Sequence, residues 1–339
     1  MRTKRKASRP GAAEQVRERN CSVARTVSIL SDAWAFLVIR EAFFGARRFE
    51  TFRAALGLPR GTLSARLKSL TQQGIFRQAH YGEGSSRVEY RLTEAGLDLY
   101  PSFMALMQFG DRWLTGKSGP PLQLIHADCG KACKPIVACS ACLEHVRPQE
   151  SSYRDGPGAG RTAVQAMKRS RRASDPSQFM RGRPSSVSLS LQAIGDKWTF
   201  LVIREAFLGV RRFDKFLSEL NIAPNILADR LSRLIGRGIF EKRKYQDLPE
   251  RYEYRLTEIG KDLYGSLVAM MAWGDRWLSH GRPPIQLTHG TCGKDFTPTV
   301  ICDRCRKPVT ASNMRYRLEY DPRDYEADGN HGRVAPGRI

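Results

Sequence analysis

The segment KWTFLVIREAFLGVRRF occupies residues 197–213, and nearly the same segment, AWAFLVIREAFFGARRF, occupies residues 33–49. The similarity continues beyond both: RVEYRLTEAGLDLY at 87–100 returns as RYEYRLTEIGKDLY at 251–264, and GDRWL at 110–114 returns at 274–278. PPLQLIHADCGK at 120–131 returns as PPIQLTHGTCGK at 283–294. Each copy spans about 120 residues, whereas solenoid repeats are about 20–50 residues long. The sequence therefore predicts two complete copies of one domain.

The composition of the 339 residues is that of a globular protein, with 41% hydrophobic and 27% charged residues, but its net charge is +22. Such a charge favours a polyanionic partner, either nucleic acid or an anionic membrane face, with a merely solvated basic surface as the alternative. No apolar run approaches the roughly 20 residues of a membrane-spanning helix, and the basic N-terminus lacks the apolar region of a signal peptide. We expect no membrane partner and a cytoplasmic, nucleoid-associated protein.

The order of elements in each copy is typical of a winged helix-turn-helix domain. In the first copy, short helices are expected near 23–30, at 34–44, at 47–58 and at 60–74, where Gly74 would end the fourth. Two extended runs around a Gly- and Ser-rich turn follow, and Thr93 begins a long helix with an apolar stripe. The predicted fold class is mainly α with small β-hairpins.

The fourth helix indicates DNA recognition. Leu63, Leu67 and Leu70 share one face, while the opposite face of this helix is small and polar. The second copy repeats this division, with Leu227, Leu231 and Leu234 inside. Short polar side chains suit a helix that enters the major groove, whereas an ordinary surface helix would carry more Glu.

Basic side chains also gather on the predicted wing hairpins, including Arg77, Lys242 and Arg243, where they would contact phosphate. For any single wing residue, solvated charge is an equally good explanation. The candidate DNA-binding residues are Arg60, Thr62, Ser64, Lys68, His80, Arg87, Asn225, Ser232, Arg233, Lys244 and Arg251.

The series DKWTFLVIREAFLGVRRFDKF, LADRLSRL, GIFEKRKY, RYEYRLTEIGKDL and MMAWGDRW resembles HxlR-type winged-helix transcriptional regulators. The resemblance covers about 21–115 and 185–279, and it implies DNA binding by dimers that pair through their first and last helices. It places the pairing surfaces at Leu99, Phe103 and Met107, and at Leu263, Leu267 and Met270. The first copy departs from the pattern with LPRGTL where the second has IAPNIL, so the two copies are expected to read different bases.

Each copy ends in the pattern H-x2-C-x9-C-x2-C, and Cys3His sets of this kind hold structural Zn²⁺. The sequence predicts one zinc ribbon per copy, with disulfides as the alternative. The metal ligands would be His126, Cys129, Cys139 and Cys142 in the first ribbon, and His289, Cys292, Cys302 and Cys305 in the second.

Two cysteines lie outside this pattern. Cys133 aligns with Phe296 and is not expected to be a ligand. Cys21 precedes a helix, where a thiol can be reactive. Some HxlR-like regulators carry a redox-responsive cysteine near this position, so oxidative control through Cys21 is conceivable, with an inert buried thiol as the alternative.

The predicted organisation has seven parts. They are a disordered basic tail at 1–20, winged helices at 21–115 and 185–279, zinc ribbons at 120–147 and 283–320, a flexible basic linker at 148–184, and a disordered tail at 321–339. A flexible linker of this length has a root-mean-square span on the order of 35 Å, so the copies could fold back on one another.

These observations favour a sequence-specific, double-stranded DNA-binding transcriptional regulator, with repression favoured over activation. The two copies would act as an internal pseudo-dimer, or the chain would form a homodimer. The alternative is a protein-interaction scaffold built on winged helices that do not bind DNA. An enzyme is not expected, because the carboxylates are scattered and two of the six histidines are assigned to zinc. No effector is indicated by the residues.

Overall fold

The computed structural model describes residues 17–30, 32–80, 88–163 and 183–321. Its helical body has two halves of matching element order, and the predicted fold class, mainly α with small β-hairpins, is confirmed. The first half contains α1 (Ser22–Leu30), α2 (Ala33–Phe43), α3 (Phe49–Leu56), α4 (Arg60–Gln72), β2 (Phe76–His80), β3 (Val88–Leu92), α5 (Glu94–Leu97) and α6 (Tyr100–Trp113). A short 3-10 helix, η1 (Gly116–Ser118), follows.

The second half repeats this order. It contains α7 (Ser186–Ile194), α8 (Lys197–Phe207), α9 (Phe213–Leu220), α10 (Pro224–Gly236), β9 (Phe240–Gln246), β10 (Arg251–Leu256), α11 (Glu258–Asp262) and α12 (Tyr264–Leu278). In both halves the paired strands form the wing, β2 with β3 and β9 with β10.

Local chemistry explains where these helices begin and end. The side chain of Asp32 accepts a hydrogen bond from the backbone of Ala35 at the start of α2, and Asp196 caps α8 in the same way. Gly74 follows α4 with φ of +73°, a left-handed conformation that glycine adopts without strain, as predicted.

The long helix expected from Thr93 is instead interrupted. Thr93 does cap a helix, but α5 ends at Leu97 and a new helix begins at Tyr100. At the interruption the backbone N–H of Leu99 bonds to the carbonyl of Gly96, three residues back, rather than four. The break at Asp98 directs its carboxylate toward the other half of the chain, where Trp277 Nε1 donates to it at 2.7 Å.

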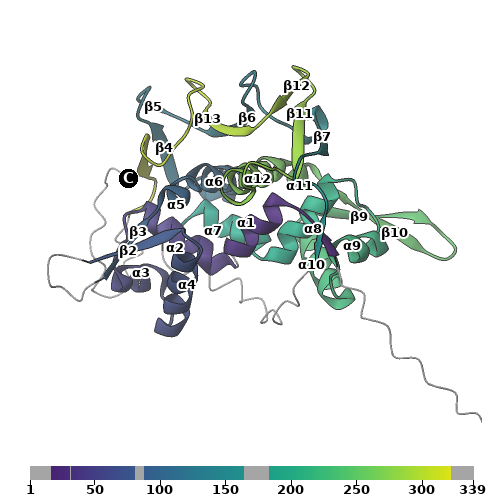
Figure 1. The fold of residues 1–339 in the computed structure, drawn as a ribbon, viewed down its shortest axis with the longest axis horizontal. Coiled ribbons are helices and arrows are strands. Elements are labelled where there is room, and N and C mark those ends of the chain that lie inside the picture. Colours follow the sequence, from purple (N-terminus) through teal and green to yellow (C-terminus); the bar gives the residue numbers. More distant parts are fainter. Residues whose placement is uncertain (1–16, 31, 81–87, 164–182, 322–339) are drawn as a thin grey trace, which may run out of the picture.

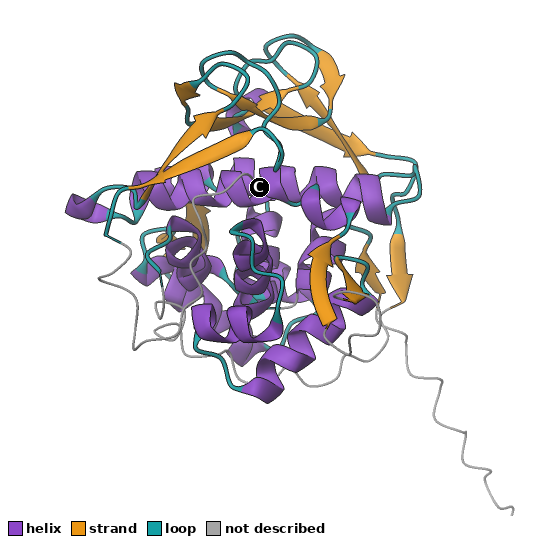
Figure 2. Ribbon diagram, turned by 90° about the vertical axis from the view of Figure 1, so that its left-hand side faces the viewer, coloured by secondary structure: helices purple, strands orange, loops and turns teal. Residues whose placement is uncertain are grey.

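A layer of strands covers one side of the helical body (Figures 1 and 2). Its strands are β4 (Leu122–His126), β5 (Lys131–Ala132), β6 (Pro135–Cys139), β7 (Ser151–Asp155), β11 (Ile285–His289), β12 (Lys294–Phe296), β13 (Pro298–Cys302) and β14 (Met314–Leu318). They form the sheets β14-β4-β5, β12-β11-β7 and β13-β6. Every sheet in the layer therefore joins strands that follow the first winged helix to strands that follow the second.

The prediction of a flexible linker over 148–184 is wrong for residues 148–163. This stretch forms η2 (Pro148–Glu150), β7 and β8 (Arg161–Ala163), and β8 pairs with β1 (Arg17–Arg19), part of the predicted N-terminal tail. The glycines here serve close packing: a Cβ on Gly156 would lie 2.3 Å from the carbonyl oxygen of Pro283. The predicted linker residues 164–182, and the tail residues 1–16 and 322–339, lie outside the described residues.

The two halves meet through reciprocal contacts between equivalent residues. α1 packs on α12, and α7 packs on α6. Phe36 stacks on its equivalent Phe200 with ring centroids 5.9 Å apart, and Asp32 forms an isolated β-bridge with its equivalent Asp196. In the strand layer Val137 pairs with its equivalent Val300. Self-pairing of equivalent positions defines an approximate two-fold axis that runs through the helical body and the strand layer.

The residues expected to form pairing surfaces are all buried: Leu99, Phe103, Met107, Leu263, Leu267 and Met270. Gly110 in α6 permits the close approach of α7, because a Cβ there would lie 2.2 Å from the carbonyl oxygen of Ser186. Gly274 in α12 faces Ser22 in the equivalent way. None of the helices in the described part of the chain has both the length and the apolar composition needed to cross a membrane.

Candidate DNA-binding surface and metal centres

The fourth helix of each copy has the two faces that the sequence predicted. Leu63, Leu67 and Leu70 of α4 are buried, as are Leu227, Leu231 and Leu234 of α10. The opposite faces are exposed: Gly61, Ser64, Ala65 and Lys68 on α4, and Asn225, Ala228, Ser232 and Arg233 on α10. Both helices lie on the side of the molecule away from the strand layer (Figure 1). The small, polar outer faces of α4 and α10 are therefore open to solvent.

An ion pair that the sequence analysis missed anchors each of these helices. Arg66 of α4 donates from Nε to Asp32 Oδ1 at 3.0 Å and from Nη2 to Oδ2. Arg230 of α10 donates from Nε to Asp196 Oδ1 at 3.0 Å. Because Asp32 and Asp196 also meet each other on the two-fold axis, these pairs connect the recognition helices to the contact between the halves. The sequence repeat could have indicated these ion pairs, because Asp32 and Arg66 recur 164 positions later as Asp196 and Arg230.

Several of the predicted DNA-binding cations are paired with acids. Arg60 donates to Glu50 at 2.8 Å, and Arg233 lies 3.0 Å from Asp229 in the preceding turn of α10. Thr62 is half-buried, whereas Ser64, Asn225 and Ser232 are exposed. Lys68 makes no ion pair within the described part of the chain. Exposed pairs of this kind are weak and exchange readily with phosphate.

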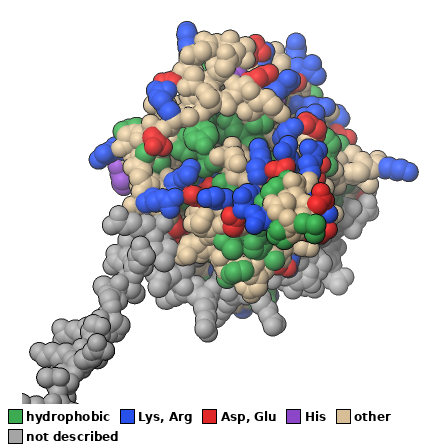
Figure 3. All heavy atoms as spheres, turned by 90° about the vertical axis from the view of Figure 1, so that its right-hand side faces the viewer, with side chains coloured by type: hydrophobic (Ala, Val, Ile, Leu, Met, Phe, Trp, Pro, Cys, Tyr) green, Lys and Arg blue, Asp and Glu red, His purple; other side chains and the backbone are tan. Residues whose placement is uncertain are grey.

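The wings present a similar mixture of charge. Lys244 lies 2.8 Å from Glu250 and 3.0 Å from Asp247, and hydrogen bonds to these two carboxylates raise its pKa. Lys242 lies 3.9 Å from the centre of the Tyr252 ring. On the face that includes this wing, Lys and Arg side chains are interspersed with Asp and Glu (Figure 3). His80 and Arg251 are exposed at the ends of their strands. Arg87, also predicted to contact DNA, lies outside the described residues.

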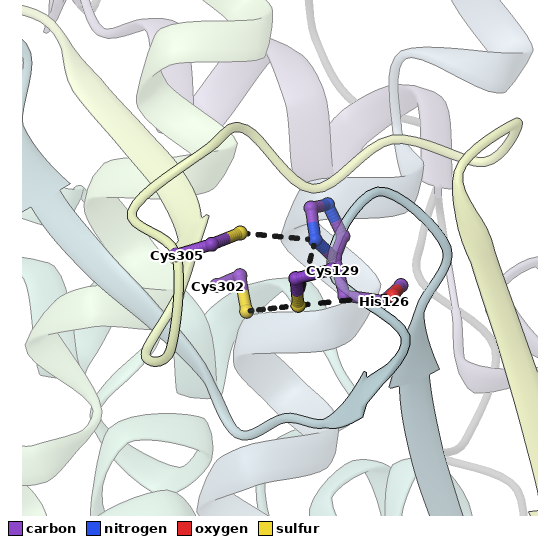
Figure 4. Close-up of side chains that lie close together, drawn as sticks. All are labelled: His126, Cys129, Cys302 and Cys305. Carbon is purple, nitrogen blue, oxygen red and sulfur yellow. Dashed lines mark hydrogen bonds between the residues drawn. The ribbon is translucent and has the colours of Figure 1, made fainter.

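The eight predicted metal ligands form two tetrads, but each tetrad combines both copies. One tetrad contains His126, Cys129, Cys302 and Cys305, and the other contains Cys139, Cys142, His289 and Cys292. In the first tetrad, His126 and Cys129 come from β4 and the turn after it, and Cys302 and Cys305 come from the end of β13 and beyond (Figure 4). The prediction that each copy completes its own ribbon is therefore wrong in its pairing.

Strand pairing explains the exchange. β6 and β13 run antiparallel with Pro135 opposite Cys302 and Cys139 opposite Pro298. This register carries the second cysteine pair of each copy across the axis, to the side where the other copy places its histidine. Each tetrad thus requires both copies to be docked.

The donor atoms fit a tetrahedral metal ion. Zn–S bonds of about 2.3 Å require sulfur–sulfur separations of about 3.8 Å. The Sγ atoms of Cys129 and Cys302 are 4.0 Å apart, and those of Cys139 and Cys292 are 3.9 Å apart. Nδ1 of His126 lies 3.2 Å from Cys305 Sγ. All donor atoms of a tetrad lie within 4.8 Å of one another.

Backbone N–H groups surround the sulfurs, as in known zinc knuckles. Gly130 and Gly293 adopt φ of +66° and +67° directly after Cys129 and Cys292, a left-handed conformation that glycine adopts without strain in a tight turn. Hydrogen bonding from the backbone at Lys131 lowers the pKa of Cys129 to about 7, and the equivalent bond from Lys294 does the same for Cys292. Nε2 of His126 lies 3.4 Å from the carbonyl oxygen of Pro308, a contact that would fix the ring for Nδ1 ligation.

The two remaining cysteines are buried. Cys133 lies near Cys302 and Asp303, but Cys302 already belongs to a complete tetrad, and burial strongly raises the pKa of the Cys133 thiol. Cys21 is 3% exposed and sits beside Arg204, whose own partner is Glu205. A redox role for Cys21 stays a prediction.

Two helix-turn-helix domains with wings, joined in one chain, define a DNA-binding protein of the transcription-regulator class. The model of the HxlR-like helix-turn-helix family matches residues 29–118 and again 193–282, so the chain belongs to this family.

Individual relatives match one copy at a time. An HTH-type transcriptional regulator of Mycobacterium tuberculosis, itself uncharacterised, is 45% identical over 130 residues, covering 38% of this chain and 82% of the relative. One from Synechocystis is 37% identical over 99 residues, covering 29% of this chain and 73% of the relative. Among solved structures, a Pseudomonas aeruginosa protein assigned as a transcription factor is 40% identical with a TM-score of 0.26, covering 31% of this chain and 72% of that protein.

Proposed function

We propose that the chain represses transcription by binding double-stranded DNA as an internal pseudo-dimer, with α4 and α10 reading two unlike half-sites. The observation that carries this proposal is the reciprocal contact between the halves, which presents both fourth helices on one side of the molecule (Figure 1). Dimeric readers of this type bind half-sites about one helical turn, roughly 34 Å, apart. Occupying an operator is sufficient for repression, which is why repression is proposed.

The two recognition helices support an asymmetric operator. Asn225 begins the exposed face of α10 where α4 has Gly61, and Ser232 stands where α4 has Lys68. An amide can bond in a bidentate way to adenine, whereas lysine bonds to guanine or to phosphate. Different side chains at equivalent positions would read different bases in the two half-sites.

Each tetrad would hold one Zn²⁺. Three thiolates and one imidazole are the donor set that zinc prefers in structural sites, and a complete set of four leaves no open position for catalysis. When bound, the ion supplies structural cross-linking only. Since each tetrad draws on both copies, two such ions would hold the halves in the docked arrangement that the operator requires.

The test is selection of bound duplexes from a random DNA pool with the full, zinc-loaded chain at a fixed physiological salt concentration. Salt must be fixed because a chain with net charge +22 binds any DNA when salt is low. Two unlike half-sites about one turn apart support the proposal. A folded, zinc-loaded chain that enriches no sequence would overturn it in favour of a protein-interaction scaffold. A reporter gene behind the selected site then tests repression.

A further inference from the structure

A groove lies between the two halves, beneath the strand layer that carries the metal tetrads, and no residue of α4 or α10 lines it. Its volume is about 1000 Å³, at the upper end of the roughly 300–1,000 Å³ typical of small-molecule sites. One wall is α6 of the first copy, the other is α11 and the start of α12 of the second, and β6 with the segment 145–150 forms the roof. We propose that this groove binds an uncharged aromatic molecule with hydroxyl or amide substituents.

A buried hydroxyl without a partner points to such a ligand. Ser266 lines the groove, its side chain is 2% exposed, and its Oγ has no hydrogen-bond partner among the described residues. Other buried hydroxyls at this interface are bonded: Thr26 donates to the carbonyl of Met270 at 3.1 Å, and Ser190 donates to that of Leu106 at 2.7 Å. The Oγ of Ser266 has almost no accessible surface in this rotamer, so rotation of the side chain toward the groove would let a polar ligand group supply the partner that Ser266 lacks.

The charges that line the groove largely cancel, which argues against an ionic ligand. Most basic side chains here already have an acidic partner: Arg112 with Asp262 at 3.1 Å, Lys261 with Glu258 at 2.6 Å, and Arg147 with Glu150 at 3.8 Å. The remaining charged residues that line the groove are Asp111 and Lys134, which carry one charge of each sign.

Neutral hydrogen-bonding groups and apolar side chains complete the surface. Burial lowers the pKa of His145, so its imidazole is neutral near pH 7 and offers one donor and one acceptor. Gln108 adds an amide. The apolar lining includes Phe109, Trp113, Ile136, Val137 and Tyr264. Aromatic and β-branched walls with a few fixed polar groups favour a flat ring with one or two polar substituents.

Asp111, Arg112, Glu258, Asp262 and Ser266 recur across the two-fold axis as Asp275, Arg276, Glu94, Asp98 and Ser102, but other positions of the groove differ. Across the axis the chain has Ala272 for Gln108, Thr297 for Lys134, Pro308 for His145, Thr310 for Arg147, Leu97 for Lys261 and Pro101 for Gly265. In a dimer of identical chains both grooves would carry the same residues. Fusion of the copies allows one groove to differ, and the differences concentrate hydrogen-bonding groups on one side.

A ligand here would contact α6 and α12 together, the helices that carry the contact between the halves. If the proposed DNA binding is correct, on which this step rests, the ligand changes operator affinity by favouring one arrangement of the halves. The ligand can change the free energy of operator binding by no more than the difference between its own binding free energies for the two arrangements.

The binding test uses 2-naphthol, an uncharged two-ring compound with one hydroxyl, and the full zinc-loaded chain without DNA. Ligand-observed NMR titration should give one saturable site with a Kd of about 0.1–1 mM. Naphthalene-2-sulfonate, which carries a negative charge, should bind at least tenfold more weakly. No saturation up to millimolar 2-naphthol, or tighter binding of the sulfonate, overturns the proposal.

The matched variants are Gln108→Trp, which fills the groove, and Ala272→Trp, which makes the same change at the equivalent position. Gln108→Trp should weaken 2-naphthol binding at least tenfold, and Ala272→Trp should leave it within twofold. Equal effects of the two variants would place the site elsewhere. Should Gln108→Trp fail to fold, Ser266→Ala, which removes a single oxygen, should weaken binding several-fold, and unchanged binding by a folded Ser266→Ala overturns the proposal.

A separate titration of the selected operator then tests regulation. A chain that binds 2-naphthol but no DNA sequence would contradict the proposed function and leave the groove intact as a site. A chain that binds its operator but not 2-naphthol would contradict only the groove.

Discussion

At the scale of single residues, the recognition face separates side chains that read bases from those that contact phosphate. We expect Asn225→Ala to weaken operator binding by about 1–3 kcal/mol and to relax specificity at one base pair of one half-site. Arg251→Ala, on the wing, should weaken binding to all sequences and reduce the slope of log affinity against log salt by about one. Affinity measurements at several salt concentrations, on the operator and on single-base variants, distinguish the two effects. A uniform loss from Asn225→Ala would contradict its assignment as a base reader.

A buried carboxylate provides a test of the interface by pH. Asp275 accepts a hydrogen bond from Ser22 at 2.5 Å between α12 and α1, and burial raises its pKa to about 6. The unfolded chain has a pKa near 4 at this residue, so it releases its proton at lower pH than the folded chain does. Between pH 4 and 6 the folded state therefore binds more protons, and the free energy of unfolding falls as pH rises.

Asp275→Asn keeps the acceptor oxygen for Ser22 and removes the charge. We expect it to stabilise the chain by about 1–2 kcal/mol at pH 7.5, with the gain vanishing toward pH 4. Denaturant unfolding of the variant and the parent across this range measures the difference. Asp247→Asn is the control, since its side chain is 89% exposed in the wing and it should change stability by less than about 0.5 kcal/mol. A gain that does not depend on pH would show that burial of the charge is not its cause.

At the scale of elements, the exchange of cysteine pairs between the copies makes a prediction about zinc stoichiometry. In the crossed arrangement, Cys129 and Cys302 share one tetrad, so Cys129→Ser/Cys302→Ser should retain one zinc per chain. Cys129→Ser/Cys139→Ser breaks both tetrads and should retain none. Ribbons closed within each copy would give the opposite result for both double variants. Metal analysis of purified protein after gel filtration provides the count, and the parent chain should contain two.

The same elements show what the sequence could and could not predict. The leucine spacing of α4 and α10, Gly74 at the helix end and the eight metal ligands follow from local periodicity and spacing. The pairing of the ligands does not, because a pattern present twice is satisfied equally by ligands from one copy or from both. That choice depends on the antiparallel register of β6 with β13, which is a contact between distant segments.

The linker prediction fails over residues 148–163 for a related reason. Glycine-rich sequence is typical of flexible linkers, but Gly156 and Gly158 approach the backbone of Pro283 and Arg282, where any Cβ would collide. The polar strand Ser151–Asp155 lacks an apolar pattern because it forms the edge of its sheet beside β11. A sequence shows the glycines and not the neighbours that require them.

At the scale of the whole molecule, fusion replaces the symmetry of a homodimer by an approximate two-fold axis, and the operator should reflect this. One chain should suffice for one operator, since each supplies two recognition helices. Light scattering of the purified complex should therefore give one chain of 38.3 kDa per duplex. Two chains per duplex would favour a homodimer of the fused chain and contradict the internal pseudo-dimer.

Substitutions on one recognition helix can make the DNA-reading faces of the two copies identical. Giving α4 the exposed residues of α10, through Gly61→Asn, Ser64→Ala, Ala65→Asp, Lys68→Ser and Ser69→Arg, leaves Leu63, Leu67 and Leu70 in the core and should not disturb folding. Sequence selection with this variant should return an inverted repeat of the half-site read by the second copy, because both helices then present the same groups to the groove. The converse exchange on α10 is the matched control and should return an inverted repeat of the other half-site. If both variants still select the original asymmetric operator, the bases are read by other elements, and the wings become the candidates.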